Sequence, residues 1–358
     1  MTGVQTCALP IYLDYDRQGG AWTPNKYGGH ENLEAIEFLR ELNQMAFSVN
    51  PNVLMIAEES TAWPLVTRPP EVGGLGFNLK WNMGWMNDMC HYLKLDPWFR
   101  QDHHRDITFS MMYAFSENYV LPISHDEVVH MKGSVVGKMP GDYENQLRCL
   151  RGFYAYLLAH PGKKLLFMGA ELGQWHEWDS DGQLDWYLLD QDINQKVHRF
   201  FKDINAFYKK EPALWEIDFS WEGFEWLVPD DNHNNVVVFL RKDKKGRDLL
   251  CAVNFSPNTY ENYRMGVPSH RRYVPVFNTD DPVYGGDGFG DAAAVAVEAI
   301  PSHGKEYSAA IRIPAFGAVF LRGEGTLPQP RKKKQAKEVQ SVKASVNEAN
   351  EAKELEKT

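Results

Sequence analysis

The first half of the chain repeats one pattern three times: a helix-like segment followed by a short strand that is apolar on both faces. The pairs are residues 30–47 with 53–60, 107–115 with 118–127, and 144–160 with 165–173. Strands that are apolar on both faces are buried on both sides, which is typical of a parallel sheet. A polar or glycine-rich cluster follows each strand, and ligands gather at that end of parallel strands. We therefore predict an α/β core with a ligand site at the carboxyl ends of its strands.

The second half of the chain has a different pattern. Short strand-like pieces alternate with turn clusters such as DDNHNN and KDKKG, which predicts an all-β sandwich domain over residues 213–322. Residues 323–358 contain no aromatic residue and are dense in Lys, Glu and Ala, which predicts a charged, disordered tail. Residues 12–212 then form the α/β part.

Composition narrows the class of protein. The formal net charge of −10 argues against nucleic acid as a partner, because phosphate binding needs clustered Lys and Arg. Four cysteines lie far apart without a CxxC pair, which fits a reducing compartment better than a disulfide framework or a zinc site. No apolar run reaches the length of about 18 residues that indicates a membrane span. We therefore expect a cytoplasmic protein, and a monomer.

Two neighbouring glutamates, Glu58 and Glu59, end the first strand in the sequence IAEES. Neighbouring residues on an extended strand point to opposite faces, so one carboxyl can face a cleft while the other packs beneath it. A carboxyl that lies among apolar residues and beside a second carboxyl has reason for a raised pKa, which a general acid near neutral pH needs. A capped or salt-bridged structural pair fits this dipeptide equally well.

The second strand ends in SHDEVVH, which concentrates His125, Asp126, Glu127 and His130. Histidine and carboxylate can bind metals, but the two histidines are five residues apart instead of the four of an HExxH motif. We therefore expect no metal here, and instead expect His125 and Asp126 to hold substrate hydroxyls through charge-assisted hydrogen bonds. Two acidic strand ends in one sheet fit glycoside chemistry, in which one acid protonates the leaving oxygen and a second carboxylate is the nucleophile.

Five segments, in this order, resemble the 1,4-α-glucan (glycogen) branching enzymes of the α-amylase superfamily. They are IAEEST, GGLGFNLKWNMGWMND, LPISHDEVVHMKGS, MPGD and GKKLLFMGAELGQWHEWD, and the resemblance runs from about Tyr12 to Gly323. HDEVVH and KWNMGWMND favour branching enzymes over plain α-amylases. The resemblance implies a (β/α)₈ TIM barrel, of which this chain has the C-terminal part, followed by an all-β sandwich.

The resemblance also implies a role for each strand-end residue. By motif position Glu58 is the proton donor and acid–base catalyst, Asp126 is the transition-state stabiliser, and His125 binds sugar hydroxyls. Glu59 and Glu127 are expected to bind substrate near the acceptor and donor sugars.

Trp81 is a further candidate for substrate binding, as a stacking platform, although core packing fits this residue as well. The implied reaction cleaves an internal α-1,4 bond, holds the freed segment on an aspartate and transfers it to a C6 hydroxyl. It belongs to glycogen biosynthesis, takes an α-glucan as its partner, and needs neither a metal nor an organic cofactor.

The start of the chain departs from the family. The resemblance implies a nucleophilic Asp at the end of the fourth barrel strand, which would fall near Gln5, yet no Asp precedes Asp14. The early barrel strands and the usual N-terminal β domain are also missing. Residues 1–11, MTGVQTCALPI, resemble instead the in-frame translation of a sequencing-adapter oligonucleotide. We therefore expect residues 1–11 to be non-native and this chain, as written, to be inactive.

Two other functions stay open at this point. One is an α-amylase-like hydrolase or debranching enzyme, and the other is a non-catalytic remnant that only binds glycans. New α-1,6 linkages without release of reducing sugar would favour a branching enzyme over a hydrolase or debranching enzyme. A non-catalytic remnant would instead bind glycans as a stable isolated chain.

Overall fold

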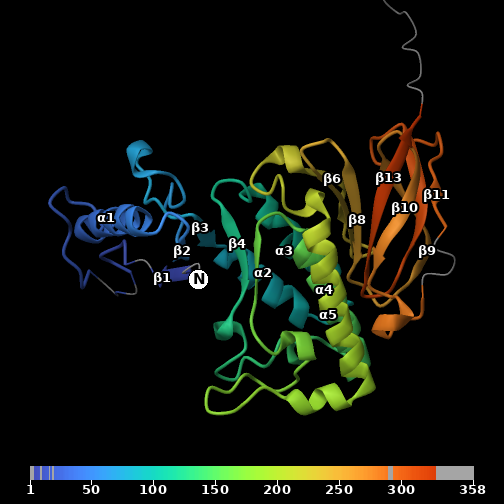
Figure 1. Ribbon diagram of the computed structural model, residues 1–358, viewed down its shortest axis with the longest axis horizontal. Helices are drawn as coiled ribbons and strands as arrows, with labels where there is room; N and C mark the ends of the chain where they lie inside the picture. The colour runs from blue at the N-terminus through green and yellow to red at the C-terminus, as the bar shows by residue number, and fades with distance from the viewer. Residues whose placement is uncertain (1–3, 9, 16, 18–19, 289–292, 328–358) are drawn as a thin grey trace, which may run out of the picture. The chain divides into compact units, whose positions relative to one another are not determined.

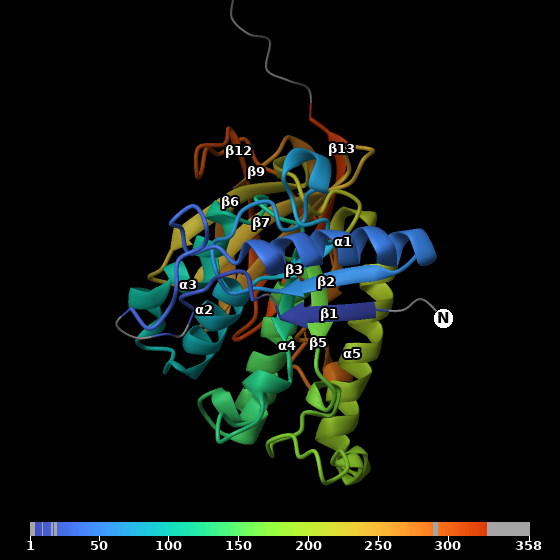
Figure 2. The same cartoon turned by 90° about the vertical axis from the view of Figure 1, so that its left-hand side faces the viewer.

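A five-stranded parallel sheet, with its strands in chain order, forms the first part of the structure (Figures 1 and 2). In this computed structural model, residues 4–8, 10–15, 17, 20–288 and 293–327 are described. The strands are β1 (Val4–Ala8), β2 (Leu54–Glu58), β3 (Leu79–Trp81), β4 (Tyr119–Ile123) and β5 (Lys163–Leu166). Every residue of β4 is buried, as predicted for a strand that is covered on both faces. The prediction is wrong for the other two strands, because β2 is buried only at alternate residues and no residue of the edge strand β5 is fully buried.

Helices connect the parallel strands. They are α1 (Leu33–Val49) before β2, α2 (Met83–Lys94) and α3 (Arg105–Thr108) before β4, α4 (Tyr143–Ala159) before β5, and α5 (Asp192–Lys210) after it. The first predicted helix-then-strand pair is present, and the third is present in part. Its strand β5 shares only residues 165 and 166 with the predicted strand 165–173, because the chain turns after Leu166 and forms a 3₁₀ turn at Ala170–Leu172. The second pair differs from the prediction, because its helix is only α3 followed by a 3₁₀ turn, Phe109–Met112.

Local sequence explains where the three longer connecting helices begin. Asn32, Asn82 and Asp142 are the N-caps of α1, α2 and α4, and the side-chain oxygen of each accepts a backbone N–H three residues later at 2.9 to 3.1 Å. A cap of this kind contributes about 1 kcal/mol to helix stability. Asn82 alone separates β3 from α2, whereas the cap of α4 ends the long loop that follows β4 at the carboxyl edge of the sheet.

Two strands of the sheet were not among the three predicted from the sequence. The strand β3 has only three residues, too few for a recognisable pattern. The strand β1 lies within residues 1–11, and it pairs in parallel with β2 from Val4 opposite Leu54 to Ala8 opposite Glu58. The assignment of residues 1–11 as non-native stays a prediction.

The second part of the structure consists of antiparallel strands. Six of them form one sheet in the order β11-β10-β13-β8-β7-β6, and two more pair as β12-β9. Their bounds are β6 (Phe224–Asp231), β7 (Val236–Lys242), β8 (Asp248–Asn254), β9 (Tyr260–Val267), β10 (His270–Asn278), β11 (Val295–Ala296), β12 (Tyr307–Ile313) and β13 (Ala318–Thr326). The predicted boundary at residue 322 is four residues too early, because β13 pairs in the sheet and continues to Thr326. Of the predicted tail, residues 328–358 lie outside the described residues.

Alternate residues of β7 enter two different cores. Val237 and Phe239 join the large cluster that contains α2, α4 and α5, whereas Val236, Val238 and Leu240 join the cluster that also contains residues of β9 and β12. The sequence VVVFL is apolar at every position because both faces of this central strand are buried.

A buried arginine joins the two parts. Arg241, on β7, donates from Nη1 to the carbonyl of Ala159 at the end of α4 at 2.6 Å, and from Nε to the carbonyl of Gly223 at 3.2 Å. Its Nη2 donates to Oδ1 of Asp218 at 3.0 Å, and neither side chain of this ion pair is more than 2% exposed. Separately, among the residues that the structure describes, no helix has the length and apolar character that a membrane span needs.

Candidate active site

The two glutamates at the end of β2 have different environments. Glu58 is the last residue of the strand and is half-buried, whereas Glu59 is only 5% exposed and accepts the backbone N–H of Thr61 at 2.6 Å. Burial raises the pKa of the Glu58 carboxyl, and the negative charge of Asp126 raises it further, against an opposing effect of His125. A carboxyl with a raised pKa stays protonated closer to neutral pH, which is the property of a general acid.

The strand β4 brings the second predicted group to the same edge of the sheet. His125 and Asp126 lie in a 3₁₀ turn, His125–Glu127, that directly follows β4. Nε2 of His125 is 3.2 Å from Oδ1 of Asp126, and both side chains are about half exposed. Together with Glu58, these residues form an accessible group that holds two carboxyls in different surroundings. The raised pKa of Glu58 fits the acid of retaining glycoside chemistry, and Asp126 is a second carboxyl beside it but is not the expected nucleophile.

Glu127 has a structural part in the turn after β4, and its expected role beside a substrate sugar stays a prediction. Its side chain is buried, and Oε2 accepts the backbone N–H of Ser124 at 2.6 Å, while the Ser124 side chain accepts the N–H of Glu127. This reciprocal pair is a capping box, which the sequence S-x-x-E is known to form. In this structure Glu127 therefore positions the turn that carries His125 and Asp126.

Trp81 is likewise mostly buried. Its side chain is 7% exposed at the end of β3, which leaves little ring face for stacking, and Nε1 has no hydrogen-bond partner among the described residues. Trp81 and Glu59 both line a pocket of about 340 Å³ beside the carboxyl ends of β2 and β3. Their roles in substrate binding stay predictions.

Two buried lysines, which the sequence did not indicate, hold the loops that carry the acidic groups. Lys80, on β3, donates from Nζ to the carbonyl of Thr61 at 2.9 Å in the loop after β2. Lys138 donates from Nζ to the carbonyls of Lys132 at 2.8 Å and Gly133 at 2.6 Å, and also to the carbonyl of Glu127, all in the loop after β4. Burial lowers the pKa of each ammonium group, so their hydrogen bonds to carbonyls are needed to offset desolvation.

We expect Lys138→Met to destabilise the protein by about 2 to 3 kcal/mol, because it leaves several buried carbonyls of one loop without a donor. Urea unfolding of the 358-residue chain measures the change. Lys132→Met is the matched control, since Lys132 is an exposed lysine of the same loop and its loss should change stability by no more than about 0.5 kcal/mol. Equal midpoints for the two variants would show that Lys138 does not hold the loop.

Comparisons with known proteins show what this chain is similar to. Residues 226–324 match the model of the α-amylase C-terminal all-β domain. The chain is 51% identical over 323 residues to a 1,4-α-glucan branching enzyme of Aquifex aeolicus, covering 90% of this chain and 51% of that protein. It is 50% identical over 313 residues to the branching enzyme of Halothermothrix orenii, covering 87% of this chain and 50% of that protein.

The chain is a relative of the 1,4-α-glucan branching enzymes. It spans about half the length of the curated relatives that it matches. A solved structure, the α-amylase of H. orenii, aligns with a TM-score of 0.52 at 16% identity, over 84% of this chain and 58% of that chain. The predicted fold class, part of a barrel followed by an all-β domain, is confirmed, and so is the resemblance to the branching-enzyme family.

Proposed function

We propose that this chain carries the acid–base catalyst and the transition-state stabiliser of a 1,4-α-glucan branching enzyme. The observation that supports this most strongly is Glu58 itself. It is a half-buried carboxyl at a strand end, and burial and the nearby Asp126 raise its pKa. The high identity to branching enzymes over 90% of the chain supports the same activity.

In the proposed reaction, Glu58 protonates the oxygen of an internal α-1,4 glycosidic bond so that the first glucan segment can leave. Asp126 stabilises the positive charge that develops on the sugar, and His125 donates a hydrogen bond to its hydroxyls. The other segment is held as a covalent glycosyl-aspartate. The Glu58 carboxylate then deprotonates a C6 hydroxyl, which attacks and forms the α-1,6 branch with retained configuration.

The aspartate nucleophile is the part of this proposal that the chain does not supply. The strand β1 pairs with β2 where the resemblance implies the fourth barrel strand, and its sequence VQTCA contains no carboxylate. We propose that residues 1–11 are non-native and that residues 12–212 are the barrel part. The β-sandwich then extends from residue 213 to Thr326, the end of β13, and the charged tail follows it. We also propose that the branching enzyme is a cytoplasmic monomer that acts on glycogen-like α-glucan.

A hybrid enzyme tests the proposal. Residues 12–323 replace the matching segment of the Aquifex aeolicus branching enzyme, so that the relative supplies the remaining parts of the barrel. We expect the hybrid to branch amylose and the 358-residue chain alone to show no activity, because loss of a covalent nucleophile costs several orders of magnitude. Branching by the isolated chain, or a folded hybrid with no action on α-glucan, would contradict the proposal.

A further inference from the structure

Two adjacent helical segments outside the proposed catalytic group each present a histidine and an aspartate three residues apart. Asp88 and His91 lie on α2, while His103 ends a 3₁₀ helix, Arg100–His103, and Asp106 lies on α3. The residue between the last two, His104, has helical backbone angles (φ −57°, ψ −25°), so the helical path continues through it. Residues three apart on a helix share a face, which places a His–Asp pair on each segment.

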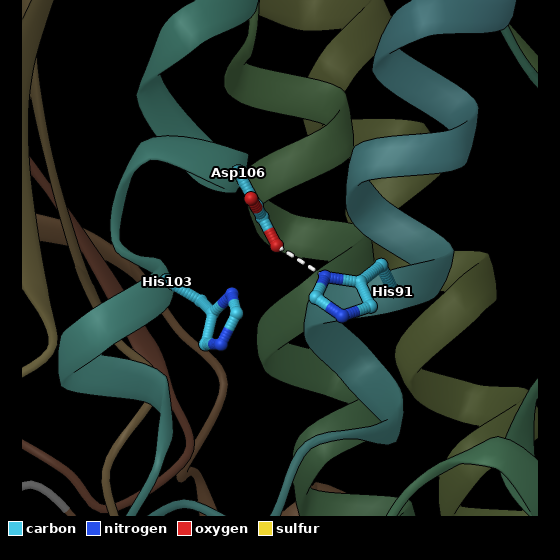
Figure 3. Close-up of side chains that lie close together, drawn as sticks. All are labelled: His91, His103 and Asp106. Carbon is cyan, nitrogen blue, oxygen red and sulfur yellow. Dashed lines mark hydrogen bonds and ion pairs between the residues drawn. The ribbon is translucent and has the colours of Figure 1, made fainter.

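The two pairs meet where the segments pack together. Figure 3 shows His91 on one helix facing Asp106 and His103 on the other, with Nδ1 of His91 2.7 Å from Oδ2 of Asp106. The ring centroids of the two histidines are 5.0 Å apart. One potential ligand atom from each of the three residues lies within 4.8 Å of the other two, and all three side chains are at least partly accessible.

This set of donors matches the chemistry of a divalent transition metal. Zn²⁺ takes imidazole nitrogens and carboxylate oxygens at about 2.0 to 2.2 Å in a tetrahedron, in which neighbouring ligand atoms lie roughly 3.4 Å apart. Small side-chain rotations bring atoms that are within 4.8 Å to that spacing. Among the described residues, the group with ligand atoms within that distance consists of these three residues, and a water molecule can take the fourth position.

We propose that His91, His103 and Asp106 form a binding site for one Zn²⁺ or a similar divalent transition-metal ion. The ion would link the last turn of α2 to the start of α3 and so stabilise this connection between β3 and β4. The proposed glycosyl transfer uses no metal, and the site is therefore independent of it. A simpler role is a hydrogen-bonded His91–Asp106 pair in which His103 takes no part. A metal site requires His103 for Zn²⁺ binding, whereas the hydrogen-bonded pair does not.

Titration of the metal-free 358-residue chain tests the proposal. Isothermal titration calorimetry with ZnCl₂ is expected to show one strong site per chain, and Co²⁺ is expected to give the visible absorption of tetrahedral coordination. His103→Gln and Asp106→Asn should each weaken Zn²⁺ binding at least about 100-fold, since loss of a direct ligand costs no less than loss of an outer-shell partner. His198→Gln, an exposed histidine of α5, is the control and should bind as the parent does.

Thermal unfolding without metal shows whether each variant is folded. If either His103→Gln or Asp106→Asn misfolds, the other variant still tests the proposal. Zn²⁺ should raise the melting temperature of the parent and of His198→Gln, but not that of His103→Gln, because only a ligand of the native state stabilises it. Absence of Zn²⁺ binding by the parent would overturn the proposal. Equal affinity of the parent and folded His103→Gln would overturn it as well.

Discussion

Replacing Glu58 with glutamine in the hybrid enzyme is expected to lower the rate of α-1,6 linkage formation by about 10²- to 10⁴-fold. Glutamine keeps the size of the side chain, but it can neither protonate the leaving oxygen nor deprotonate the attacking hydroxyl. Both halves of the proposed reaction therefore lose their proton transfer. Linkage formation is measured on amylose with equal amounts of folded protein.

The control for this substitution is Glu37→Gln. Glu37 lies on α1, its side chain is 67% exposed, and its replacement should leave the rate unchanged. Because burial and then Asp126 raise the pKa of Glu58, the acid stays protonated to a higher pH than an ordinary glutamate. On the alkaline side of the pH profile, the kcat/KM of the unsubstituted hybrid should therefore begin to fall at that raised pKa, because deprotonated Glu58 cannot act as the acid. A Glu58→Gln hybrid that keeps more than about a tenth of the rate would rule out its role as acid–base catalyst.

Arg241→Leu is expected to lower the free energy of unfolding by about 3 to 5 kcal/mol, because it removes one partner of a buried ion pair. The substitution leaves the carboxylate of Asp218 with less compensation, and it leaves the carbonyls of Ala159 and Gly223 without their donor. Arg199→Leu is the matched control. The ion pair of Arg199 with Asp203 lies on the surface of α5 with the arginine 56% exposed, and such pairs contribute at most about 1 kcal/mol.

The same network predicts how stability depends on pH. Burial, the largest influence, raises the pKa of Asp218, but the positive charges of Arg241, Lys164 and Lys163 together lower it below its ordinary value. A carboxyl with a lowered pKa contributes stability above its unfolded pKa of about 4, and this contribution is lost as pH falls through the folded value. Urea unfolding between about pH 2 and pH 7 should therefore show a weaker acid dependence in Arg241→Leu. Equal losses in the two arginine variants would contradict the role given to Arg241.

The fold could be predicted where periodicity extends over enough residues. The helix α1 and the buried strand β4 follow directly from their apolar patterns, and the alternating faces of β7 account for its continuous apolar sequence. The helix α2 was not predicted, although Asn82 is a good N-cap and Trp85, Met89 and Tyr92 are buried at helical spacing. Asn82 and Trp85 lie in the segment KWNMGWMND, and Met89 and Tyr92 directly follow it, but this helical pattern is short and is interrupted by polar residues.

The candidate site could be predicted in part. The different surroundings of Glu58 and Glu59 follow from strand alternation, and the capping box of Glu127 could have been recognised from the sequence S-x-x-E. Lys80 and Lys138 could not, because lysines are almost always exposed and only the packed loops surround these two. Likewise, the i, i+3 pairs that contain His91 and Asp106 are visible in the sequence, but only the packing of α2 and α3 brings them together.

The most direct test of the proposed function counts two products of the hybrid enzyme acting on amylose. Proton NMR gives the number of new α-1,6 linkages, and a reducing-sugar assay gives the number of new chain ends released to water. Branching predicts that α-1,6 linkages accumulate while the number of reducing ends stays constant. An increase in reducing ends without new α-1,6 linkages would identify a hydrolase and contradict the account.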